Sequence, residues 1–177
     1  MKQIKLKNLT ITAIFAALIC LSGVISVPFI VPITLQTLFI SLCVGLLGTK
    51  RAIFAVSAYI FLGLLGLPVF AGMQGGVGAL FSNTGGFILG FLPFVIIKGI
   101  TQKLFKNNLW GNALSSFFGL LALYLIGSIW FCVIYYGSID FATYISSLSL
   151  SVLPFILPDI IKIFISAIIE KRLKNKF

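Results

Sequence analysis

The stretch WGNALSSFFGLLALYLIGSIWFCVIYY at residues 110–136 contains no charged side chain. A helix over this run would extend about 40 Å at ~1.5 Å per residue, more than the ~30 Å hydrocarbon core of a bilayer. The whole chain has the same character, since 60% of its 177 residues are apolar, only 9% are charged, and its mean hydropathy is +1.19. Soluble domains carry about 25% charged residues. The composition therefore excludes a soluble domain and predicts an all-α membrane protein.

Five further apolar runs flank this stretch. A spanning helix needs about 20 mainly apolar residues. The lysines before the first run could begin a signal peptide, but the run has no clear cleavage site and five more runs follow, so we interpret it as a retained helix. The sequence thus predicts a single integral membrane domain, residues 1–177, with six transmembrane helices at about residues 9–27, 33–47, 52–67, 87–100, 110–136 and 152–169.

The basic residues predict which side of the membrane each loop faces. Twelve of the 13 lysines and arginines fall before the first run, at residues 50–51, at residues 98–106 and after the last run. The alternate loops contain Asp140 and no basic residue. Basic residues near span ends are retained in the cytoplasm. We therefore expect both termini on the cytoplasmic side of a bacterial plasma membrane, with Lys98, at the end of the fourth run, near the inner side.

Several kinds of chemistry lack the residues that they need. The chain has no histidine, no paired acidic residues, no Walker motif and no CxxC spacing among its three cysteines. Its basic residues are not interleaved as a nucleic-acid-binding face. We expect no enzyme activity, no metal, no cofactor and no nucleic-acid partner, so binding or transport in the lipid bilayer fits the chain better than catalysis does.

One acidic and one basic residue fall inside the last apolar run. Asp159 and Lys162 are three residues apart, which places them on one face of a helix. A lone charge near the centre of a spanning helix costs about 2.5–3.5 kcal/mol, so such residues usually face a partner or a polar cavity. We predict that this pair lines an outward-facing pocket. The alternative is that the two charges only neutralise each other and hold the bundle together.

A glycine-rich segment at residues 68–86 separates the third and fourth runs, on the outer side. Glycines allow close approach of the backbone to a ligand, and Gln74, Asn83 and Thr84 offer neutral hydrogen bonds. A plain structural hairpin is the alternative. Gln36, at the start of the second run, could contact either a helix or a ligand.

Small side chains on the first run could bring another helix close. Ala13 and Ala17 are four residues apart, a spacing that lets helices pack tightly. This face could dock another membrane protein or a helix of the same bundle, and the residues alone favour the internal contact.

Four short motifs, taken together, resemble the BioY family, the biotin-specific substrate-binding (S) components of energy-coupling-factor (ECF) vitamin transporters. They are PITLQT at residues 32–37, GLPVFAG at 66–72, TGGF at 84–87 followed by Gly90 and Phe91, and DIIK at 159–162. The resemblance spans nearly the whole chain and implies an S-component bundle with a glycine-rich outer loop between helices 3 and 4. It also implies high-affinity biotin uptake with a transmembrane coupling subunit (T component) and two cytoplasmic ATPase subunits.

The resemblance also implies roles for individual residues. Asp159 would accept bonds from the ureido group of biotin and Lys162 would donate to its carbonyl or carboxylate. Ala13 and Ala17 would form the docking face for the coupling subunit. Two alternatives stay open, an S component for thiamin or riboflavin and a non-transporting membrane assembly protein. Other side chains expected at the ligand are Asn83, Gln74, Gln36, Thr84, Phe70 and Phe81.

Overall fold

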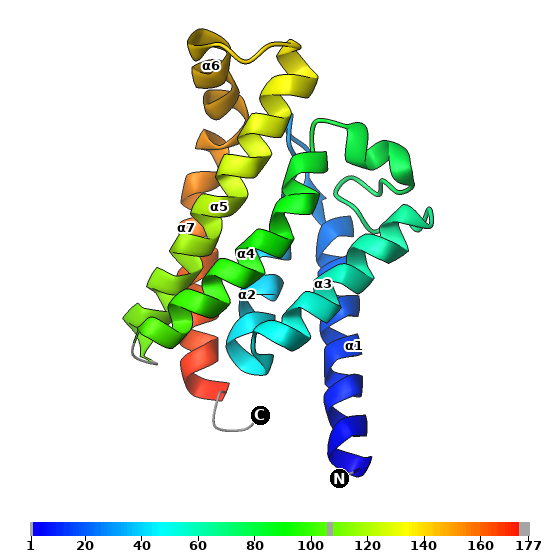
Figure 1. Ribbon diagram of the computed structural model, residues 1–177, viewed down its shortest axis with the longest axis vertical. Coiled ribbons are helices and arrows are strands. Elements are labelled where there is room, and N and C mark those ends of the chain that lie inside the picture. The colour runs from blue at the N-terminus through cyan, green and yellow to red at the C-terminus, as the bar shows by residue number, and fades with distance from the viewer. Residues whose placement is uncertain (1, 106–107, 174–177) are drawn as a thin grey trace.

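The computed structural model describes residues 2–105 and 108–173 and is almost entirely helical (Figure 1). Two short strands and a 3-10 turn lie among the helices. The elements are α1 (Lys2–Val24), β1 (Ser26–Val27), β2 (Ile33–Thr34), α2 (Gln36–Leu47), α3 (Thr49–Leu64), η1 (Val77–Phe81), α4 (Gly85–Leu104), α5 (Leu109–Tyr136), α6 (Phe141–Ser151) and α7 (Leu153–Leu173).

The helices differ in their capacity to cross a bilayer. Within the described residues, three helices are long and apolar enough to cross a bilayer: α4, α5 and the part of α1 at Leu6–Val24. The helices α6 and α7, which are bent by 47° relative to each other, add a fourth candidate if the pair forms one span. The helices α2 and α3 have 12 and 16 residues, fewer than the ~17 that a straight span needs. The count of six crossings therefore stays a prediction.

The described ends of α1 and α7 lie at the same end of the molecule (Figure 1). The glycine-rich segment and α6 lie towards the opposite end. We call these the terminal end and the loop end. This arrangement agrees with termini on one side of the membrane, and their cytoplasmic location stays a prediction.

Lys98 does not lie at the end of the fourth helix, although the predicted run ends only two residues after it. The helix α4 continues to Leu104, so Lys98 lies inside it and is fully buried, with its Nζ 2.5 Å from Glu170 Oε1. The continuation is possible because Thr101 donates its hydroxyl hydrogen to the Ile97 carbonyl oxygen at 2.8 Å, which satisfies a polar side chain within the helix. Glu170 is available because α7 also continues, to Leu173.

The outer segment between α5 and α7 is helical and well capped. Asp140 Oδ1 accepts from the Thr143 backbone N–H, and the Thr143 hydroxyl accepts from the Asp140 N–H, each at 3.0 Å. The hydrogen bond from the Thr143 backbone lowers the pKa of the Asp140 carboxyl. This reciprocal capping satisfies free N–H groups at the start of α6.

Near the loop end, two turns join α1 to α2 and α3 to α4. The strands β1 and β2 form an antiparallel hairpin in which Ser26 faces Thr34 and Val27 faces Ile33. The second turn, the glycine-rich segment, is held to the bundle by Phe70. This ring is fully buried, lies edge-on to Tyr59 at 5.4 Å between centroids, and occupies the space beside Gly63.

The core is built around a close pair of antiparallel helices, α4 and α5 (Figure 1). Glycines allow this approach, because a Cβ on Gly90 would lie 2.9 Å from Leu123 Cδ1 and one on Gly119 would lie 3.0 Å from the Phe94 oxygen. The helix α7 packs against α2 and α5. All three cysteines, Cys20, Cys43 and Cys132, are free thiols buried among these helices.

Candidate functional site

A cavity of about 540 Å³, including its open mouth, lies between α2, α4, α5 and α7 in the half of the bundle nearer the loop end. The charged part of the wall is Asp159 and Lys162, and the polar part also includes Thr37, Gln36, Thr84 and Tyr124. The apolar part includes Val31, Ile88, Phe87, Phe91, Leu123 and Phe155.

The carboxylate of Asp159 receives hydrogen bonds from three helices. Lys162 Nζ donates to Oδ1 at 2.8 Å, the Thr37 hydroxyl of α2 donates to Oδ1 at 3.0 Å, and the Tyr124 hydroxyl of α5 donates to Oδ2 at 2.6 Å. The Asp159 and Lys162 side chains are only 3% and 9% exposed. The two interpretations of this pair are thus compatible, because the charges neutralise each other and also line a cavity.

Lys162 retains capacity to bind a ligand. Its ammonium group carries three N–H donors, and within the described part of the chain its hydrogen bond is the one to Asp159. A carboxylate offers about four acceptor positions, of which Asp159 uses three. The pair can therefore present both a donor and an acceptor to the same small polar group.

Gln36 is a buried amide on the cavity wall, 3% exposed. Its Oε1 accepts from the Thr34 hydroxyl at 3.1 Å, while its Nε2 has no hydrogen-bond partner among the described residues. The Nε2 atom lies against Gly23 of α1, since a Cβ added to this glycine would be 2.8 Å from Nε2. Leaving such a donor unsatisfied costs about 1–3 kcal/mol, so water or a ligand acceptor would stabilise it.

The apolar wall is aromatic. The rings of Phe87 on α4 and Phe155 on α7 stack with centroids 6.3 Å apart, and both face the cavity, as does Phe91. Flat apolar surfaces of this kind cover the rings of a ligand while polar groups fix its orientation. The arrangement is suited to a small molecule with one polar and one apolar part.

The sequence model of the BioY family matches the chain over residues 1–177. The chain belongs to the BioY family. It is 37% identical to the probable biotin transporter BioY of Pyrococcus horikoshii, over 97% of this chain and 98% of the relative. It is 35% identical to the biotin transporter BioY of Thermotoga maritima, over 96% and 97% of the two chains.

A solved member of the same class has the same fold. The 2.1 Å crystal structure of the S component for biotin from an ECF-type ABC transporter superposes with a TM-score of 0.85. It is 30% identical in sequence, and the match covers 99% of this chain and 94% of that one. This BioY protein is therefore an S-component-like helical bundle and a multi-pass membrane protein.

The structure of this BioY protein brings four of the expected side chains together. Gln36, Thr84, Asp159 and Lys162 come from α2, the residue before α4, and α7, and all line the cavity. The position of Thr84 is set by its hydroxyl, 2.9 Å from that of Ser82. Gln36 and Thr84 are 48 positions apart in the sequence, and Thr84 and Asp159 are a further 75 apart. The bundle, rather than any local motif, therefore assembles the site.

Four expected residues lie elsewhere. Phe70 is packed in the core against Tyr59, and Phe81 is 66% exposed on η1. Gln74 is exposed and accepts from the Phe70 N–H through its backbone oxygen at 3.0 Å, and Asn83 is half-buried beside Thr84. These side chains are outside the cavity wall, so any contact between them and a ligand stays a prediction.

Sequence reasoning missed Tyr124 and the stacked phenylalanines. Tyr124 lies in the middle of the uncharged run at residues 110–136, where a hydroxyl needs a hydrogen-bond partner. That requirement was a usable signal, because the carboxylate of Asp159 is at a similar depth. The phenylalanines gave no comparable signal, since 18 of them are spread along the chain.

Ala13 and Ala17 are exposed on α1, whereas Ala16 between them is buried. The small face therefore points away from the bundle. The internal contact that the spacing alone favours is not made by these two residues within the described part of the chain.

Proposed function

We propose that this chain binds biotin in the cavity and serves as the S component of an ECF transporter that carries biotin into the cell. The observation that supports this most strongly is the cavity wall, where the Asp159–Lys162 pair lies beside stacked aromatic rings. The family assignment and the names of the relatives agree with it.

The chemistry of biotin matches this wall part by part. Its ureido group has two N–H donors and one carbonyl acceptor. The remaining acceptor position of Asp159 would take a ureido N–H, and the remaining donors of Lys162 would bond the ureido oxygen. Phe87, Phe91 and Phe155 would cover the fused rings, which are apolar apart from this group.

The carboxylate of biotin needs a different environment. Asp159 and Lys162 together carry no net charge, so the site offers no unbalanced cation to the ligand's negative tail. We expect the valerate chain to run towards the mouth of the cavity, where water solvates the carboxylate. Thr84, at the start of α4 and on the cavity wall, would offer it a neutral donor.

The sequence contains no Walker motif, so ATP-driven uptake would take its energy from partner subunits. We propose that α1 docks on a transmembrane T component, which is coupled to two cytoplasmic ATPase subunits. The exposed Ala13 and Ala17 support this docking, because small side chains let a partner helix approach closely in lipid.

Equilibrium titration of labelled biotin into the detergent-purified protein tests the proposal. We expect saturable binding with one site per chain, displaced by unlabelled biotin and not by thiamin or riboflavin. Failure to bind biotin, or equal displacement by another vitamin, would overturn the assignment of the ligand.

A further inference from the structure

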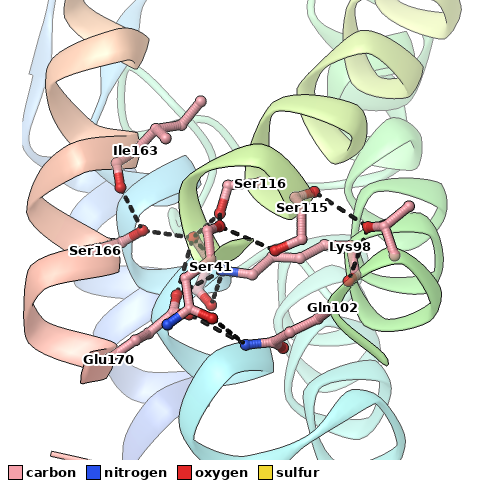
Figure 2. A network of polar contacts seen from close by, with 10 residues as sticks. Ser41, Lys98, Gln102, Ser115, Ser116, Ile163, Ser166 and Glu170 are labelled. Atoms are coloured by element: carbon pink, nitrogen blue, oxygen red, sulfur yellow. Dashed lines mark hydrogen bonds and ion pairs between the residues drawn. The ribbon is translucent and has the colours of Figure 1, made fainter. Parts of the chain in front are cut away.

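A second buried ion pair lies nearer the terminal end than the cavity and is not part of its wall. Lys98 on α4 and Glu170 on α7 are fully buried, with Lys98 Nζ 2.5 Å from Glu170 Oε1. Lys98 also donates to the backbone oxygen and the hydroxyl of Ser41 on α2, at 2.9 and 2.6 Å. Figure 2 shows these side chains converging between the helices.

Ser41 is the centre of this group, which we call the inner network (Figure 2). Its hydroxyl lies 2.7 Å from that of Ser166 on α7 and 3.1 Å from that of Ser116 on α5. Gln102 of α4 donates to Glu170 Oε2 at 3.3 Å. Directional bonds thus join four helices at one level of the bundle. The members of the inner network are Ser41, Lys98, Gln102, Asn112, Ser116, Ser166 and Glu170.

Stability alone does not account for the inner network. A buried ion pair loses the hydration of both charges, and apolar side chains of similar volume are often at least as stable in its place. What specific polar partners add is a fixed register between helices. Because α2 and α5 provide the main contacts of α7, and α4 packs chiefly on α5, Lys98 extends across the bundle to reach Glu170.

Two of the four helices joined by the inner network, α2 and α7, also bond each other at the cavity wall. On α2, Thr37 donates to Asp159, and Ser41, one turn later, bonds Ser166. On α7, Asp159 and Glu170 are eleven residues apart, about 16 Å along the helix axis at ~1.5 Å per residue. The helices α2 and α7 are therefore bonded at two levels, and a shift of α7 that breaks one level would disturb the other.

The half of α7 that lines the cavity has weak support from its own backbone. Pro158, immediately before Asp159, lies inside the helix and has no N–H to donate. The helix also begins at the 47° bend from α6. Side-chain hydrogen bonds consequently set the position of α7 against α2 and α5. The bonds of the inner network hold the part of α7 that follows Pro158.

We propose that Lys98 and Glu170 are positioning residues for ligand recognition, which hold α7 so that Asp159 and Lys162 face the cavity in the geometry that a ureido group needs. This inference rests on the proposed function, because ligand binding is the property that reveals it.

The double variant Lys98→Met with Glu170→Met tests the proposal without leaving a buried charge unpaired. Ser41, Ser116 and Ser166 retain one another as partners in this variant, and Gln102 retains Asn112, 3.3 Å away. We expect the purified protein to stay folded in detergent, with a similar melting temperature. We expect its Kd for biotin to rise at least tenfold.

Ligand selectivity separates positioning from a general loss of folded protein. If only a fraction of the protein is competent, the apparent Kd for every ligand rises by the same factor, and the ratio of two Kd values does not change. If Asp159 and Lys162 are misplaced, the protein discriminates less well against 2-iminobiotin, in which an imino nitrogen replaces the ureido oxygen. We expect the Kd ratio of 2-iminobiotin to biotin to fall at least threefold towards one.

A pair of single variants keeps the test decisive if the double variant does not fold. Ser166→Ala removes a hydroxyl that joins α7 to Ser41, whereas Ser115→Ala removes an equally buried hydroxyl that bonds the Asn112 oxygen of its own helix at 2.9 Å. We expect Ser166→Ala to lower the Kd ratio and Ser115→Ala to leave it unchanged.

The outcomes distinguish this inference from the proposed function. A wild-type protein that does not bind biotin would overturn the proposed function and this inference with it. Wild-type binding together with an unchanged Kd ratio in folded Lys98→Met/Glu170→Met, or in Ser166→Ala, would overturn the positioning role alone.

Discussion

Asp159 is the residue at which hydrogen bonds from three helices meet in the site. It is bonded by Lys162, Thr37 and Tyr124, so its carboxylate is fixed in place before a ligand arrives. A fixed acceptor loses little conformational freedom on binding, which favours affinity. A substitution of Asp159 would also change the hydrogen bonding of its three donors, Lys162, Thr37 and Tyr124.

Asp159→Asn is expected to weaken biotin binding by about ten- to a hundredfold, because hydrogen bonds to charged groups contribute about 1.5–3 kcal/mol. Isothermal titration of the purified variant measures the change. Asp140→Asn is the matched control, since it makes the same chemical change on the exposed cap of α6 and should leave affinity unaltered. Wild-type affinity in Asp159→Asn would contradict the role of this carboxylate.

Tyr124→Phe removes one donor to Asp159 and preserves the ring. We expect biotin affinity to fall several-fold, because Asp159 Oδ2 loses its 2.6 Å bond and is less firmly oriented. Tyr144→Phe is the control, as its hydroxyl lies 3.3 Å from that of Ser128 and away from the cavity. Equal affinities for the two variants in the same titration would argue against this contribution.

At the scale of single residues, the sequence predicted which charged residues line the cavity better than it predicted which aromatic rings do. Asp159 and Lys162 were identifiable because charge within lipid is expensive wherever it occurs. Phe70 and Phe81 were expected to cover the apolar rings of the ligand, but one is in the core and the other is exposed. Which way an aromatic ring in an irregular loop points depends on the turns around it, and a single sequence does not determine those turns.

At the level of elements, Gly48 makes the tight junction between α2 and α3. It has φ +83° and ψ 164°, a conformation open essentially to glycine alone. The two helices follow each other with this one residue between them. The short α2 is thereby turned directly into α3, and its buried face is held against α7 and α4.

Gly48→Ala should lower the free energy of unfolding by about 1–3 kcal/mol, the usual magnitude of such backbone strain. Thermal denaturation of the purified protein measures it. Gly78→Ala is the control, because Gly78 has no positive φ and a Cβ there would meet nothing within 4 Å. A melting temperature that falls equally in both variants would refute the strain argument.

Neither the element boundaries nor the separate helix α6 followed from the apolar runs alone. The first five apolar runs each overlap one of α1 to α5, but the basic residues did not mark the helix ends. Lys98 lies inside α4 because Glu170 meets it there, and these two residues are 72 positions apart in the sequence. A lysine near the end of an apolar run is normally in water, and only the packed bundle reveals its partner.

On the scale of the whole molecule, the two functions proposed for the chain occupy different surfaces. The ligand cavity lies between α2, α4, α5 and α7, whereas Ala13 and Ala17 are exposed on α1. Binding and docking should therefore be separable by mutation.

The double variant Ala13→Leu with Ala17→Leu is expected to bind biotin with wild-type affinity but to lose most uptake in cells that contain the T component and ATPases. Bulk at these positions would prevent close approach of a partner helix. Uptake of radiolabelled biotin, normalised to the amount of protein in the membrane, is the measurement. Ala142→Leu, an exposed alanine on α6, should transport normally. Undiminished uptake in the double variant would exclude α1 as the docking face.

The burial of Cys20, Cys43 and Cys132 leaves the native protein without an accessible sulfhydryl among its described residues. A new cysteine at an exposed position would then be the preferred target of a membrane-impermeant maleimide, with no need to remove the natural ones. Val77→Cys in η1 and Lys103→Cys near the end of α4 are both exposed and lie towards opposite ends of the molecule. In intact cells the first should be labelled and the second protected, which would determine the orientation of the chain in its membrane.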